Sequence, residues 1–182
     1  LHGDALDIDP LAHLTPPIRV VANLPYNVGT KLLVGWLAQA AAFESLTLMF
    51  QQEVAERIVA RPGDDAYGRL GVLAGWRTQA RIAFNVDRNA FTPPPKVTSS
   101  VVHLQPRPVS ANISVRSVEE LTREAFGERR KMIRQSLKRL GVPLDVLFAT
   151  VGKRGDERAE NLSVDDYLAM AGAVGEMRRS ER

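Results

Sequence analysis

Apolar and polar positions along the first hundred residues alternate between strand-like and helix-like spacing. The run Ile18–Leu24 is mostly apolar and of strand length, which is typical of a central strand in a parallel sheet. Leu33 and Leu37 lie four positions apart, on one face of a predicted helix. The predicted elements of this part are strands over 18–24 and 46–50 and helices over 29–42, 52–60 and 70–77. Strands that alternate with helices in this order predict an α/β sheet.

Two later segments alternate between polar and apolar residues over much of their length. Thr78–Val86 reads TQARIAFNV, which predicts an exposed or edge strand, and Val97–Leu104 reads VTSSVVHL, which predicts a strand that pairs with it as an antiparallel hairpin. The segment between them, Phe91–Lys96 with the sequence FTPPPK, is a stiff connector of the polyproline type. At the other end, residues 1–15 are predicted to be a short strand end followed by an acidic loop.

The pattern changes after residue 105. Four helices joined by short loops are predicted over 117–127, 128–140, 144–151 and 164–177. Ser117 and Ser163 each begin a sequence with an acidic residue three positions later, which is typical of helix caps. We therefore expect two domains, a sheet domain over 1–105 and a small helical domain over 106–182. A helical unit of this size has a marginal core on its own, so we expect it to pack on the sheet domain.

Composition narrows the class of protein. The chain has 182 residues, of which 45% are hydrophobic, enough for a real core. Opposite charges balance over residues 1–105, so the whole net charge of +3 comes from residues 106–182. A localised basic surplus suggests a polyanionic partner.

Several kinds of site are excluded by residue content. The chain has no cysteine and only three scattered histidines, so we expect no disulfide, no thiolate chemistry and no metal site. No apolar run approaches the roughly 20 residues of a membrane span, and no signal peptide is visible. These features predict a soluble cytoplasmic protein, which we expect to be a monomer. The chain opens at Leu1 inside what looks like a domain, so we expect the natural protein to begin further upstream.

The predicted strand over 18–24 runs into the sequence Asn23-Leu24-Pro25-Tyr26. In open α/β sheets, ligands bind beyond the carboxyl ends of the strands. The Asn23 amide can accept a hydrogen bond from an amine, Pro25 holds the loop in one shape, and Tyr26 offers a face on which a base can stack. An ordinary turn with a half-buried tyrosine would have the same four residues, so the motif alone leaves both interpretations open.

Five motifs occur in order along nearly the whole chain: GDAL (Gly3–Leu6), NLPY (Asn23–Tyr26), QQEVAERIVARPGDDAYGRLGVL (Gln51–Leu73), NAFTPPPKVTSSVV (Asn89–Val102) and AFGERRKMIRQSL (Ala125–Leu137). With them, the chain resembles the ribosomal RNA adenine dimethyltransferases of the KsgA and Erm type, which use S-adenosylmethionine. The glycine-rich cofactor loop of that family and its ribose-binding acidic residue do not occur in these 182 residues. The resemblance implies the C-terminal portion of a Rossmann-like methyltransferase sheet followed by a small all-α domain.

The resemblance also implies roles for residues at the matching motifs. Asn23, Leu24, Pro25 and Tyr26 would form the catalytic motif, in which Asn23 and the backbone carbonyl of Leu24 or Pro25 accept hydrogen bonds from the amine of an adenine and aim it at the methyl group of the cofactor. Asp4 and Asn23 would contact the cofactor, and Tyr26 and Phe91 would stack on the extruded base. From the residues alone, a core side chain under a loop is the preferred interpretation of Phe91, and a solvated carboxylate is the commoner one for Asp4.

A cluster of six cations without an acidic residue among them lies within eleven positions: Arg129, Arg130, Lys131, Arg134, Lys138 and Arg139. On a helix over 128–140, Arg130, Arg134 and Lys138 would form one basic stripe beside an apolar stripe of Phe126, Ile133, Leu137 and Leu140. Such a stripe suits contacts with RNA phosphates, which position the RNA without reading its sequence. A merely solvated charged face is the alternative.

The function expected from these features is dimethylation of adjacent adenosines in small-subunit (16S) rRNA, with S-adenosylmethionine as cofactor and the pre-30S particle as partner. This branch is preferred to the Erm-like methylation of large-subunit rRNA because GERRKMIRQSL resembles it more closely. A ribosome-assembly factor that binds RNA without catalysis is an alternative of another class. These 182 residues alone, without the glycine-rich loop, are expected to be inactive.

Overall fold

The computed structural model describes residues 2–108 and 113–180, which form two compact units. The first unit contains residues 2–59 and 77–108, and the second contains residues 60–76 and 113–180. The change of pattern along the sequence predicts a single boundary near residue 105. By its contacts, however, the chain also enters the second unit earlier, over residues 60–76.

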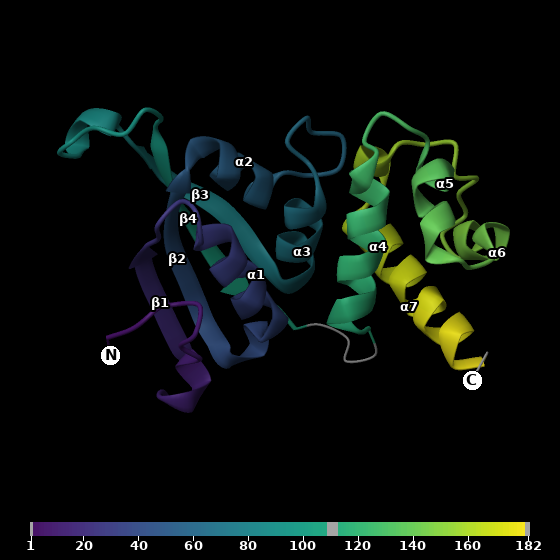
Figure 1. Ribbon diagram of the computed structural model, residues 1–182, viewed down its shortest axis with the longest axis horizontal. Helices are drawn as coiled ribbons and strands as arrows, with labels where there is room; N and C mark the ends of the chain where they lie inside the picture. The colour runs from purple at the N-terminus through teal and green to yellow at the C-terminus, as the bar shows by residue number, and fades with distance from the viewer. Residues whose placement is uncertain (1, 109–112, 181–182) are drawn as a thin grey trace. The chain divides into compact units, whose positions relative to one another are not determined.

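The first unit is built on a four-stranded sheet with the order β1-β2-β4-β3 (Figure 1). Its strands are β1 (Ile18–Asn23), β2 (Phe43–Gln51), β3 (Thr78–Val86) and β4 (Ser99–Pro106). β1 and β2 are parallel, whereas β4 is antiparallel to both β2 and β3. The predicted α/β sheet with a late antiparallel pair is therefore confirmed.

The position of β1 in this sheet corrects one expectation. The apolar run 18–24 predicted a central strand, but among the described residues β1 lies at one edge, and Val21 is 81% exposed. β3 lies at the other edge, as its alternating sequence predicted. No strand is found in residues 2–17, where a short 3₁₀ turn at Pro10–Ala12 takes the place of the predicted strand end.

Two helices belong to the first unit: α1 (Gly29–Ala38) and α2 (Gln52–Val59). The predicted helix over 29–42 is shorter than expected, because residues Ala40–Ala42 form a separate 3₁₀ turn. The backbone of Gly29 comes so close to the sheet that an added Cβ would lie 3.2 Å from the Phe50 ring. α1 therefore covers the sheet face on which Leu46, Leu48 and Phe50 are buried, and its first turn is fixed at the carboxyl end of β1.

The second unit is helical. Its elements are α3 (Arg69–Arg77), α4 (Val115–Gly127), α5 (Ile133–Ser136), a 3₁₀ turn at Leu137–Leu140, α6 (Leu144–Ala149), a 3₁₀ turn at Ala159–Asn161 and α7 (Val164–Ser180). The cap predicted at Ser117 is wrong, because α4 already begins at Val115. The cap at Ser163 is confirmed: its Oγ accepts from the Asp166 N–H at 3.0 Å, and the Asp166 carboxylate accepts from the Ser163 N–H at 2.9 Å. None of the described helices is both long and apolar enough to cross a membrane.

The continuous helix predicted over 128–140 is wrong, since residues 128–132 are not helical. The N–H groups of Ile133 and Arg134 do not bond with carbonyls of residues 128–132, as they would in a continuous helix. They donate instead to the carbonyls of Glu157 and Gly155, at 2.8 and 3.1 Å. The predicted basic stripe of Arg130, Arg134 and Lys138 on one helix therefore does not exist. Ile133, Leu137 and Leu140 are nevertheless buried, as their apolar spacing predicted, whereas Phe126 is half-buried.

Residues 60–76 contribute core side chains to the second unit. Tyr67 is fully buried, and its ring packs edge-on against Phe126 with the centroids 6.0 Å apart. Phe126 in turn lies 5.6 Å from the buried ring of Tyr167. The Gly63 N–H donates to the Glu160 carbonyl at 2.9 Å, so backbone bonds also hold this segment to the unit.

The two buried tyrosines differ in their hydrogen bonding, which leads to a matched pair of predictions. The Tyr167 hydroxyl donates to the Ala159 carbonyl at 2.8 Å, whereas the Tyr67 hydroxyl has no partner among the described residues. We expect Tyr167→Phe to lower the free energy of unfolding by about 1 kcal/mol, because it removes a buried hydrogen bond to the Ala159 carbonyl, whose remaining bond, from the Leu162 N–H, is long at 3.4 Å. Tyr67→Phe removes only an unpaired hydroxyl, so unfolding in urea at pH 7 should show equal or higher stability. Equal losses in the two variants would contradict this assignment.

The same pair predicts a loss of stability in alkali. Burial raises the pKa of both Tyr67 and Tyr167 above the ordinary tyrosine value. In the unfolded chain, both hydroxyls release a proton near pH 10, while the folded state keeps them neutral. The stability due to these neutral tyrosines is therefore fully present below about pH 10 and is lost as the pH rises further. Tyr67→Phe should flatten this loss, as measured by urea unfolding between pH 7 and pH 11.

Candidate active site

The loop that follows β1 is held in place from both sides. Leu24 is buried, and the Pro25 carbonyl accepts hydrogen bonds from the N–H groups of Val28 and Gly29, at 3.1 and 2.9 Å. These bonds turn the chain directly from the strand into α1. Asn23 and Tyr26, on either side of this turn, are exposed, and Tyr26 is 44% accessible.

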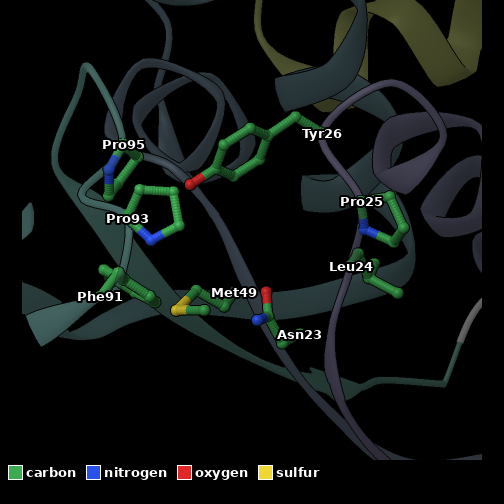
Figure 2. Close-up of a pocket in the computed structure, with 8 residues that line it drawn as sticks. All are labelled: Asn23, Leu24, Pro25, Tyr26, Met49, Phe91, Pro93 and Pro95. Carbon is green, nitrogen blue, oxygen red and sulfur yellow. The ribbon is translucent and has the colours of Figure 1, made fainter.

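A pocket of about 360 Å³ opens at this loop (Figure 2). Its lining consists of Asn23, Leu24, Pro25, Tyr26, Met49, Phe91, Pro93 and Pro95. Figure 2 shows Asn23 and Met49 side by side at one end of the pocket, with Tyr26 reaching across the other end toward Pro93 and Pro95. The carboxyl ends of the two parallel strands and the loop between β3 and β4 together form the walls.

The structure thus brings five residues singled out from the sequence around one pocket: Asn23, Leu24, Pro25, Tyr26 and Phe91. Sequence reasoning missed Met49, which lies on β2 opposite Asn23 in the parallel register. Met49 could have been predicted only from the register of the two strands, which pairs it with Asn23. Pro93 and Pro95 were noted as a stiffening run beside Phe91, but they also line the pocket.

A second missed residue lies behind the pocket lining. The hydroxyl groups of Tyr26 and Ser99 are hydrogen-bonded at 3.0 Å. Ser99 is the first residue of β4, and its side chain is completely buried. From the sequence, the VTSSVV segment predicts only an alternating strand. A serine at a buried position of such a strand is the feature that could have identified Ser99.

Asp4 lies apart from these residues. It is exposed, it is not in the pocket lining, and its Oδ1 accepts a hydrogen bond from the Leu6 N–H at 2.9 Å. This bond closes a tight turn within the GDAL segment. The cofactor contact predicted for Asp4 therefore stays a prediction, based on the resemblance.

The predicted RNA-binding cations lie in the second unit, most of them beside acidic groups. Arg129 donates to the Asp65 carbonyl, Lys131 pairs with Glu128 at 3.0 Å, and Arg139 lies 3.8 Å from the same carboxylate. Neighbouring cations, chiefly Lys131, lower the pKa of Glu128. Arg130 and Lys138 are exposed and have no ion pair within the described ranges.

Arg134 is engaged inside the unit. Its guanidinium donates to the Arg154 carbonyl at 2.6 and 3.1 Å and to the Asp145 carboxylate at 2.7 Å. It also lies over the Phe148 ring, 5.2 Å from the centroid. These contacts connect α5, α6 and the turn at residues 154–155, which gives this side chain a structural role.

The pocket lining determines which chemistry this chain can contribute. It contains an amide, backbone carbonyls, a methionine, two aromatic rings and three prolines, but no carboxylate, histidine or lysine. Such a site can accept hydrogen bonds from a planar amine and hold a flat ring, whereas proton abstraction by a strong base has no candidate in the lining. No group of acidic, histidine or cysteine side chains suited to a metal ion is found in the part of the chain that the structure describes.

Comparisons with known proteins show the family to which the chain belongs. A family model described as ribosomal RNA adenine dimethylase matches residues 1–174. Two curated relatives named ribosomal RNA small subunit methyltransferase A, from Azorhizobium caulinodans and Xanthobacter autotrophicus, are 56% and 54% identical over 98% of this chain. The chain spans only 62% and 63% of their lengths.

Solved structures show the same fold. A dimethyladenosine transferase from Plasmodium falciparum is 28% identical, with a TM-score of 0.79 over 93% of this chain and 70% of its own. The 23S rRNA methyltransferase ErmE has a TM-score of 0.64 at 24% identity, covering 96% of this chain and 71% of its own, and supports the fold alone. The predicted Rossmann-like methyltransferase fold is confirmed, and the chain belongs to the ribosomal RNA adenine dimethylase family.

Proposed function

We propose that the protein dimethylates the exocyclic amines of adjacent adenosines in small-subunit (16S) rRNA during assembly of the small subunit. The observation that carries this proposal is that the Asn23 amide and the Tyr26 and Phe91 rings line one pocket. The names of the similar curated proteins favour the small-subunit branch. The partner in this proposal is the pre-30S particle in the cytoplasm.

The adenine amine is a weak nucleophile, because its lone pair is delocalised into the ring. The reaction therefore needs groups that orient this amine. Two acceptors that bind its N–H groups hold the amine and direct its lone pair toward the methyl donor. Asn23 Oδ1 supplies one acceptor at the pocket. The second is the Leu24 carbonyl rather than that of Pro25, since the Pro25 carbonyl already accepts two hydrogen bonds in the turn.

The base itself must leave its stack to reach the pocket. Aromatic side chains favour an extruded base because they replace the stacking that it loses. Tyr26 projects from the loop after β1, and Phe91 comes from the loop before β4, so the two rings approach from different elements. Pro93 and Pro95 limit the movement of the second loop.

The methyl group would come from S-adenosylmethionine, which supplies an electrophilic methyl when bound. The residues of this chain fit one end of that cofactor: the Asn23 amide lies exposed at the pocket, and the second carboxylate oxygen of Asp4 has no hydrogen bond within the described ranges. Such an oxygen can accept from the amino group of an adenine. The roles of Asn23 and Asp4 toward the cofactor therefore form part of the proposal.

The RNA contacts in this proposal come from the exposed cations of the second unit, Arg129, Arg130, Lys131 and Lys138, with Arg134 holding their scaffold. We expect Arg130→Gln/Lys138→Gln to weaken RNA binding and to reduce the slope of log affinity against log salt by about one unit or more. Arg116→Gln/Arg123→Gln removes the same charge from α4 and serves as the control. Filter binding at several salt concentrations measures both variants. Equal losses in the two variants would show a diffuse charge effect without a defined contact.

The experiment that tests the function is methyl transfer from labelled S-adenosylmethionine by the full-length protein. Small and large subunits, free and partly assembled, serve as substrates. We expect two methyl groups on each of two small-subunit adenosines. Product only on the large subunit would replace the proposal by the Erm-like alternative. Binding to the small subunit without any product would favour the assembly factor.

A further inference from the structure

We propose that Ser99 is a positioning residue, which fixes the direction of the Tyr26 side chain and so sets one wall of the base-binding pocket. The proposal rests on the proposed function and adds to it a residue outside the pocket lining. Its basis is the 3.0 Å hydrogen bond between the two hydroxyl groups, which joins positions 73 residues apart in the sequence.

The two ends of this bond lie in different surroundings. Ser99 is fully buried at the start of β4, where its backbone is paired with Gln51 of β2 and Val86 of β3. It is therefore held from both sides by the sheet. Tyr26 is 44% exposed and stands on the loop between β1 and α1. The bond thus connects an exposed aromatic side chain on a loop to a buried residue within the sheet.

A tyrosine ring held only at its Cα can swing about χ1 and leave the pocket wall. The Tyr26 backbone follows the Pro25 turn, which fixes the Cα end of the side chain. The bond to Ser99 fixes the hydroxyl end. With both ends held, the ring axis is set before a base enters, and a preorganised wall loses less entropy when the base binds.

The exposure of the two partners predicts what happens when the bond is removed. In Ser99→Ala, the hydroxyl of the half-exposed Tyr26 can bond with water, so the fold is expected to persist. The neighbouring Ser100 supplies a matched control. It is also fully buried on β4, but its hydroxyl donates to Asn85 Oδ1 at 2.8 Å, and it does not line the pocket.

Kinetics of the full-length protein separate positioning from binding. We expect Ser99→Ala to lower kcat about tenfold, because small displacements of an oriented group have effects of this size or larger. The KM for RNA should stay within about twofold, because phosphate contacts provide most of the affinity. Ser100→Ala should leave both constants unchanged, and Ser99→Thr, which keeps a hydroxyl, should recover most of kcat.

Coupling between the two residues gives a stricter criterion. If Ser99 acts through Tyr26, the double variant Tyr26→Phe/Ser99→Ala should be no slower than the slower of the two single variants. Additive losses in kcat would overturn the proposal, as would a loss in Ser99→Ala that Ser100→Ala matches.

A readout that does not require methyl transfer distinguishes this proposal from the proposed function. In protein labelled with 3-fluorotyrosine, the fluorine lies beside the hydroxyl and reports its hydrogen bonding by ¹⁹F NMR. Of the three tyrosines in these 182 residues, Tyr67 and Tyr167 are fully buried and Tyr26 is exposed, and the Tyr26→Phe variant, which lacks one resonance, identifies the Tyr26 signal. Ser99→Ala should shift the Tyr26 resonance and increase its response to D₂O, while Ser100→Ala should not. An unchanged resonance in an active enzyme would disprove the anchor, whereas a shifted resonance in a protein without methyl transfer would disprove only the proposed function.

Discussion

Asn23→Ala is expected to reduce methyl transfer to rRNA by at least about a hundredfold, as is typical when an oriented polar group that acts on the reacting atoms is removed. Affinity for RNA should stay within about twofold, since the amide contacts one amine and phosphates dominate binding. The exposed side chain of Asn23 forms no hydrogen bond with another described residue, so its removal should leave the fold intact. Single-turnover transfer rates and filter binding measure the two effects.

Asn27 provides the control for this variant. It is an exposed asparagine in the same loop, four positions further on, and it does not line the pocket. Asn27→Ala should therefore keep its methyl-transfer rate. If Asn23→Ala remains active, the acceptor role assigned to this amide is wrong, even if the pocket binds the base. If Asn23→Ala and Asn27→Ala are equally slow, the loop as a whole rather than one amide carries the effect.

The site could be predicted from the sequence to the extent that its residues are neighbours in the chain. Asn23 to Tyr26 form one short motif at a strand end, whose chemistry suits an amine and a flat ring but also allows an ordinary turn, and the family resemblance decides between the two. Met49 and Ser99 come from other strands, and only the strand register places them beside the motif. Phe91 was found through the family resemblance, because a phenylalanine before three prolines has no feature of its own that indicates a pocket.

The fold shows the same limit on what local pattern can predict. The alternation in 78–86 predicted an edge strand correctly because the pattern itself reports which side of a strand is exposed. The apolar run 18–24 predicted a central strand, although β1 is at the edge of the sheet among the described residues. An apolar sequence indicates that a strand is suited to burial. It does not indicate how many neighbouring strands or helices cover it, and Val21 is exposed among the described residues.

The helix expected over 128–140 failed for a different reason. Its residues have adequate helix propensity and an apolar spacing of the helical type, which accounts for the buried Ile133 and Leu137. The backbone N–H groups of residues 133 and 134, however, bond with carbonyls more than twenty residues away. Tertiary hydrogen bonds therefore override the local preference, and the same distant turn also engages the Arg134 side chain.

That turn leads to the second large expected effect. Gly155 has a φ of +81°, and a Cβ added there would lie 2.5 Å from the Phe148 ring, which is itself buried. Gly155→Ala should therefore have two costs, about 1–2 kcal/mol for the left-handed backbone and about 1–3 kcal/mol for the overpacked ring. Urea unfolding should show the free energy of the second unit lowered by roughly 2–5 kcal/mol in total.

Gly152→Ala separates the two costs. Gly152 also has a positive φ, +63°, but nothing lies within 4 Å of an added Cβ, so only the backbone cost of about 1–2 kcal/mol applies. The difference between the variants then measures the clash with Phe148, and the double variant Gly155→Ala/Phe148→Leu should be less destabilised than the sum of its parts. Equal losses at the two glycines would mean that the ring can move away. Arg134 would then have to move too, because its guanidinium lies over the same ring.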